Sequence, residues 1–105
     1  EGVDDTWAES RRHYYNEQFQ RVLAALAKQY FAEKKIMTAQ KFANELLTFD
    51  PYREDIHRLV MKIFALQGKK AAVKKHFDSL AEMLRDELGI EPTQETKRLA
   101  NELLK

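Results

Sequence analysis

Residues 23–51, which read LAALAKQYFAEKKIMTAQKFANELLTFDP, decide the fold. Apolar side chains recur every three or four residues on both sides of Lys34 and Pro51 closes the stretch, so the pattern predicts a helix, a turn and a second helix. Much of it recurs at one constant offset, which we call the repeat register: Leu26 pairs with Val60, Tyr30 with Phe64, Ala39 with Val73, Ala43 with Phe77 and Leu46 with Leu80. A period of this length, about 34 residues built from two helices, is typical of tetratricopeptide-type repeats, which bind partners.

These repeats predict an all-α, five-helix tetratricopeptide-like array with a C-terminal capping helix, forming one domain over residues 1–105. Repeat 1 is expected at about 20–51, repeat 2 at about 54–88 and the capping helix at about 93–105. The first helix is expected to start near residue 6 and to be about twice as long as the second, so its first half overhangs its partner.

The sequence makes specific predictions for the turns at Lys34 and Pro51 and for the end of the fourth helix. Lys34 takes the turn position that Gly68 takes in repeat 2, and a lysine in a left-handed turn costs on the order of 1 kcal/mol, so we expect the first turn to differ. Pro51 is expected to open the third helix, with Asp50 as its cap. The fourth helix is expected to continue as far as Leu88 and to end at Gly89. Thr93 is expected to cap the last helix.

Composition limits the classes of function. The chain has 105 residues, 44% hydrophobic and 33% charged, which suits one helical domain with a single core. The absence of cysteine excludes disulfides and thiolate metal sites and favours a cytoplasmic location. No apolar run approaches the roughly 20 residues that a membrane span needs, so we expect a soluble protein. A net charge of +1 gives little attraction for nucleic acid, and we expect no specific DNA binding by this chain.

Catalytic and cofactor sites are not predicted. The three histidines, His13, His57 and His76, are expected on different helices without carboxylate or histidine neighbours at ligand spacing. No nucleotide-binding glycine loop or nucleophile elbow occurs in the sequence. We therefore expect a protein that is not an enzyme, with no cofactor, no metal and no small-molecule substrate. The basic run at residues 69–76 either faces solvent, which its amphipathic spacing favours, or contacts an acidic partner or a DNA backbone.

Three stretches resemble a known family. They are Trp7-Ala8-Glu9 with Arg12, DPYREDIHRL at residues 50–59, and LRDELGIEPTQET at residues 84–96. In this order they resemble the bacterial transcriptional activator domain, across essentially the whole chain. The resemblance implies a tetratricopeptide-like module that lies C-terminal to a winged-helix DNA-binding domain in antibiotic-regulatory-type activators and in some response regulators of two-component systems. Lys34 departs from the family pattern, which tends to have glycine there.

Two surfaces are candidate binding sites. In tetratricopeptide geometry the first helix of each hairpin faces the concave side, which predicts a partner-binding groove lined by Arg21, Lys28, Phe31, Arg58, Lys62 and Leu66. Its cations suit an acidic or helical partner segment, although they would also suit a purely solvent-facing surface. Trp7 and Tyr14 share one face of the overhang and predict an interdomain or dimer interface, unless the last helix or a bend in the first one covers them.

The sequence thus predicts a protein interaction and regulatory module of a cytoplasmic bacterial transcriptional regulator. Its expected partner is its own DNA-binding domain or a second protomer, and RNA polymerase subunits are a further candidate. The alternative is a free-standing, peptide-binding tetratricopeptide adaptor with no link to DNA.

Overall fold

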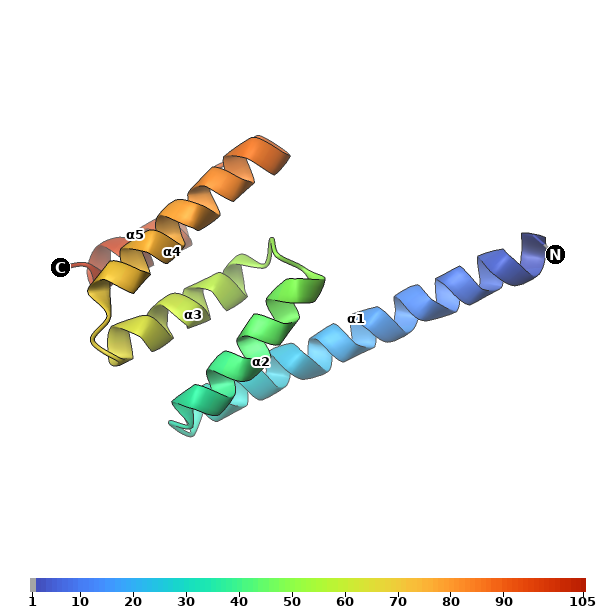
Figure 1. Ribbon diagram of the computed structural model, residues 1–105, viewed down its shortest axis with the longest axis horizontal. Helices are drawn as coiled ribbons and strands as arrows, with labels where there is room; N and C mark the ends of the chain where they lie inside the picture. Colours follow the sequence, from blue (N-terminus) through green and yellow to red (C-terminus); the bar gives the residue numbers. More distant parts are fainter. Residues whose placement is uncertain (1) are drawn as a thin grey trace. The chain divides into compact units, whose positions relative to one another are not determined.

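The regular structure of the chain is helical in the computed structural model (Figure 1). The structure describes the backbone of residues 2–105 and the side chains of residues 9–11 and 13–105. Within this part of the chain, five α-helices and one π-helical segment follow one another and no strand occurs, which confirms the predicted all-α fold. The helices form two compact units, Glu1–Phe49 and Asp50–Lys105, each described here by itself.

Unit 1 is a hairpin of α1 (Gly2–Ala32) and α2 (Ile36–Phe49). Its interior is built from small and aliphatic side chains: Ala27, Ala39, Ala43 and Leu46 are each 0% exposed. Small residues let two helix backbones approach closely, as the repeat pattern predicts for Ala39. Because α1 has 31 residues and α2 only 14, the N-terminal part of α1 extends beyond α2, as expected (Figure 1).

The turn between α1 and α2 has the same geometry as the turn of unit 2. Lys34 has a φ of 65° and Gly68 a φ of 72°. In both turns the amide of this residue donates to the carbonyl three residues earlier at 3.0 Å, and the next amide donates to the carbonyl five residues earlier at 2.9 Å. The expectation that the first turn differs is therefore wrong. Lys34 adopts the left-handed conformation, because the surrounding helices impose the same reversal on both repeats.

Unit 2 consists of α3 (Glu54–Leu66), α4 (Lys70–Met83), the π-helical segment η1 (Leu84–Leu88) and α5 (Gln94–Leu103). Its buried cluster takes Met61 from α3, Val73 from α4 and Ala100 from α5, and further apolar side chains surround this cluster: Phe64, Ala65, Phe77, Leu99, Leu103 and Leu104. The last helix thus covers the apolar face of the hairpin, as a capping helix must.

Two helix starts and the form of one helix end differ from those predicted. The first helix begins at Gly2 rather than near residue 6. The third helix starts at Glu54 rather than Pro51, because residues 51–52 form a turn in which the Tyr52 amide donates to Asp50 Oδ1 at 3.1 Å. The fourth helix does reach Leu88, but its last five residues widen into a π-helix that ends at Gly89, whose φ is 65°. A π-helical turn is uncommon and occurs mostly as a single turn within a longer α-helix, whereas here it forms the last turn of the fourth helix.

Candidate functional site

A polar cluster joins α3 to α5, and its residues come from two of the three stretches that resemble the family. Glu54 Oε1 accepts hydrogen bonds from the Thr93 backbone amide at 2.9 Å, from Thr93 Oγ1 at 3.2 Å and from Thr96 Oγ1 at 2.8 Å. Partial burial by itself raises the pKa of Glu54, but these hydrogen bonds and the nearby Arg58 outweigh it and lower the pKa. Thr93 also caps α5, as its position in the sequence predicts.

Arg58 and Tyr52 extend this cluster. Arg58 donates to Thr96 Oγ1 at 3.0 Å and pairs with Glu95 at 2.8 Å, and its side chain is only 20% exposed. The Tyr52 hydroxyl donates to Glu87 Oε1 at 2.6 Å, and this hydrogen bond raises the pKa of Tyr52. Residues 50–59 and 84–96, two of the three stretches that resemble the family, therefore contact each other and link the start of α3 to η1 and α5.

The residues predicted to line a groove are divided between the two units. In unit 1, Arg21 and Lys28 are exposed and Phe31 is half-buried. In unit 2, Lys62 is exposed and Leu66 is 66% exposed. Arg58, the remaining member, directs its guanidinium to α5, so it contributes less free charge to such a groove than the sequence suggests.

Exposed apolar side chains lie within the N-terminal two thirds of α1 and at the end of α2. Tyr14 and Tyr15 are each 57% exposed and lie edge to face, with ring centroids 5.7 Å apart. Phe19 is also exposed and makes an edge contact at 5.4 Å with Phe49, the last residue of α2. We call these four residues together with Val22 the aromatic stripe. Tyr14 belongs to the predicted interface, whereas the side chain of Trp7, its other member, lies outside the described residues.

The prediction that the histidines have no histidine or carboxylate neighbours is wrong. His13 Nε2 lies 3.0 Å from Glu17 Oε1, one turn along α1, and His57 and His76 are in contact. His57 Nδ1 lies 2.8 Å from His76 Nε2, and His57 Nε2 lies 2.6 Å from the Pro51 carbonyl oxygen. Burial, and secondarily the neighbouring His57, lower the pKa of His76 to about 4. The repeat register could have shown the pair, because these positions match Leu23 and Phe42 of repeat 1, which belong to the two helices of one hairpin.

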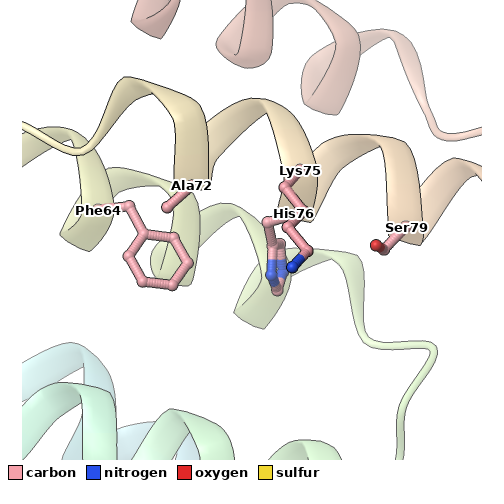
Figure 2. Close-up of a pocket in the computed structure, with 5 residues that line it drawn as sticks. All are labelled: Phe64, Ala72, Lys75, His76 and Ser79. Carbon is pink, nitrogen blue, oxygen red and sulfur yellow. The ribbon is translucent and has the colours of Figure 1, made fainter.

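The basic run at residues 69–76 is partly neutralised. Lys74 pairs with Asp78 at 3.0 Å, and Lys70 donates to the backbone carbonyl of Lys105. Lys75 instead lines a cavity of about 230 Å³ together with Phe64 of α3 and Ala72, His76 and Ser79 of α4. Figure 2 shows the Lys75 and His76 side chains extending from α4 in the same direction, with the Phe64 ring beside them.

Metal sites and membrane-spanning helices are absent from the described part of the chain. No group of three or more His, Cys, Asp or Glu side chains there is placed to hold a metal ion. The helices described are also too short or too polar to cross a bilayer. Fold and surfaces together define an α-helical repeat module whose notable features are an exposed aromatic stripe and a small basic cavity.

Comparison with known families identifies this module. Residues 1–104 match the bacterial transcriptional activator domain, and the chain belongs to this family. The resemblance that the three sequence stretches carry is thereby confirmed. Neither a curated protein nor a solved structure matched the chain.

Proposed function

We propose that this chain is the protein interaction and regulatory module of a cytoplasmic bacterial transcriptional regulator. In this proposal it lies C-terminal to a winged-helix DNA-binding domain, in some architectures within a two-component response regulator. It packs against that domain or against a second protomer through the aromatic stripe, and so sets the geometry in which the activator meets promoter DNA and RNA polymerase. Family membership supports the regulatory role, and the stripe supports the mode of action.

The exposure of the aromatic stripe is the observation that carries the proposal. Val22 is 53% exposed, whereas Ile56, its counterpart in the repeat register of unit 2, is 0% exposed. Exposing several tyrosine, phenylalanine and valine side chains of one hairpin to water is unfavourable, and apolar surface of this kind commonly marks an interaction site. Aromatic residues are also the usual anchors of protein interfaces, since they bury a large area with few rotatable bonds.

Direct DNA reading by this chain is not part of the proposal. Its net charge is +1, and two lysines of the basic run, Lys70 and Lys74, already have partners within unit 2. A protein that binds DNA through phosphates needs a clustered excess of free cations. We therefore expect no sequence-dependent retardation of a promoter fragment by the isolated chain at physiological salt.

One observation favours the adaptor as a second candidate. Leu66 is 66% exposed near the end of α3, and Lys62, one turn earlier, is also exposed. An apolar anchor with a neighbouring cation would suit a peptide bound along α3.

The experiment compares Tyr14→Ala with Leu66→Ala. Sedimentation velocity measures self-association of the chain and its binding to a winged-helix DNA-binding domain, the domain that the proposal places before it. Tyr14→Ala should weaken the association by about 2 kcal/mol, roughly 30-fold in Kd, because it removes an interface anchor. Leu66→Ala should leave it unchanged, and unaltered circular dichroism of both variants would show that the fold persists. If only Leu66→Ala changes binding, the adaptor is the better description.

Trp7 provides a second readout. It is the only tryptophan, so fluorescence reports on that position alone. Its emission should be red-shifted and quenched by iodide in the isolated chain, and blue-shifted and protected once the partner is added. Protection in the monomeric chain would contradict an interface at the overhang.

A further inference from the structure

The histidine pair beside the cavity has a fixed direction of hydrogen bonding. The Pro51 carbonyl oxygen can only accept, so the proton of neutral His57 is on Nε2, and its Nδ1 must accept. His76 Nε2 therefore donates to His57 Nδ1 across the 2.8 Å contact. The remaining nitrogen of His76, Nδ1, is left with a lone pair, and His76 lines the cavity.

Among the described residues, only positive charge lines the cavity. Lys75 is its only charged lining residue among those described, and in this part of the chain it makes no ion pair, in contrast to Lys74. The titratable groups that face His76 are His57 from α3 and Lys75 from its own helix. No described carboxylate of α4, η1 or α5 lines the cavity, whose other walls are the Phe64 ring, the Ala72 methyl group and Ser79.

We propose that this cavity receives an acidic side chain of a partner protein, whose carboxylate pairs with Lys75 and hydrogen-bonds to His76. The inference rests on the proposed function, since it assumes that the chain is a protein interaction module, and it names the chemistry of one partner. A single lysine without an ion pair, in a cavity that an aromatic ring also lines, suits one carboxylate on an aliphatic stem. A DNA backbone would need a row of free cations, and Lys70 and Lys74 have partners already.

Repeat 1 offers an internal comparison. In the repeat register the cavity positions correspond to Tyr30, Thr38, Lys41, Phe42 and Glu45. Repeat 1 therefore keeps the aromatic residue and the lysine, but it has a glutamate where unit 2 has Ser79, and a phenylalanine where unit 2 has His76. Unit 2 thus has the lysine at this position without the glutamate that repeat 1 has one turn later, and an incoming carboxylate would supply the acidic group.

Binding should be linked to proton uptake. A carboxylate oxygen can hydrogen-bond to His76 Nδ1 only when that nitrogen carries a proton, which comes from solvent. In the free protein burial holds the pKa of His76 at about 4, so His76 is neutral at pH 7. If the bound carboxylate returns the pKa to its ordinary value of about 6.5, affinity rises about fourfold between pH 8 and pH 6.

The test uses the whole 105-residue chain and a fluorescent, acetylated deca-glutamate peptide as the probe. Anisotropy at pH 8, 7 and 6 gives Kd, and the ring signals of His76 in NMR spectra give its pKa with and without peptide. Lys75→Met should weaken binding about fivefold or more, because it removes the pairing cation. Lys74→Met is the matched control, since it removes the same charge one residue away and outside the cavity, and should change Kd less than about twofold.

Ser79→Glu introduces into unit 2 the glutamate that repeat 1 has at the matching position, Glu45. It should raise the pKa of His76 in the free chain and weaken peptide binding, because the cavity then contains its own carboxylate. Equal effects of Lys74→Met and Lys75→Met, or a His76 signal that the peptide leaves unchanged, would overturn the proposal. Tighter, Lys75-dependent binding of a short DNA duplex or of inorganic phosphate would also overturn it and assign the cavity to phosphate. If these tests fail but Tyr14→Ala still weakens the association measured by sedimentation, the proposed function stands and only the assignment of this cavity is wrong.

Discussion

Replacing Lys34 by glycine should stabilise the protein. Lys34 has a φ of 65° and is the only residue besides glycine with a positive φ in the described part of the chain. A side chain in the left-handed region costs about 1 kcal/mol, because Cβ approaches the following carbonyl, and glycine avoids that contact. Gly68→Ala should cost about the same amount, since a Cβ at Gly68 meets nothing within 4 Å and only the φ of 72° opposes it.

Thermal unfolding followed by circular dichroism measures both effects. A change of about 1 kcal/mol shifts Tm by about 4–8 °C in a domain of about 60–100 residues. The two substitutions lie in different units, so the double variant should show the sum of their effects. Lys35→Gly is the control, because its φ is not positive and glycine there should bring no gain. A Lys34→Gly protein less stable than the unchanged chain would show that contacts of the lysine, and not its backbone conformation, dominate this turn.

Three further predictions concern the interior. The protein should lose about 2 kcal/mol of stability between pH 7 and pH 5. The pKa of His76 is about 4 in the folded protein and about 6.5 in the unfolded chain, so as the pH falls the unfolded chain takes up a proton first and is favoured. The double variant His57→Leu/His76→Phe, which restores the repeat 1 residues, should flatten this part of the stability profile, and an unchanged acid response would place its origin elsewhere. Glu54→Ala should cost about 1 kcal/mol, because it removes the carboxylate acceptor of the buried Thr96 hydroxyl, while the exposed Thr93 donors can bond to water. Faster hydrogen exchange should be confined at first to α5, and exchange that rises equally everywhere would argue against a local effect of this contact. Ala39→Leu should overpack the α1–α2 hairpin and cost about 1–3 kcal/mol, whereas an unchanged thermal midpoint would mean that the repeat register is wrong.

The fold could be predicted because its main determinants are periodic and local. The spacing of apolar residues along 23–51, together with its recurrence in the second repeat, was sufficient to place the helices and the overhang of α1. Two features depend on one residue each: the left-handed helix end at Gly89 and the N-cap at Thr93. Both were found where expected. Boundaries were less well predicted, because Pro51 is compatible with a turn as well as with the start of a helix.

The polar contacts of unit 2 could not be predicted from neighbouring residues. Glu54 and Thr96 are 42 residues apart, so no spacing rule for one helix brings them together. His57 and His76 are 19 residues apart, and only the repeat register could have paired them. The widening of the helix at Leu84 could not be predicted either, since a regular helical pattern continues through it. Arg58 shows the same limitation, because a position on the expected concave face does not reveal that the guanidinium turns to α5.

The differences between the two repeats show where binding chemistry can be added without disturbing the scaffold. The turns share one conformation although one has Lys34 and the other Gly68, so the hairpin tolerates sequence change even at a strained position. His76 in place of Phe42 keeps a ring at the same position and introduces a group that titrates. Such a substitution retains most of the packing, because the new side chain fills a similar volume and finds a hydrogen-bond partner in His57. A repeated hairpin can therefore acquire a proton-linked site in one copy while the other copy keeps the apolar version.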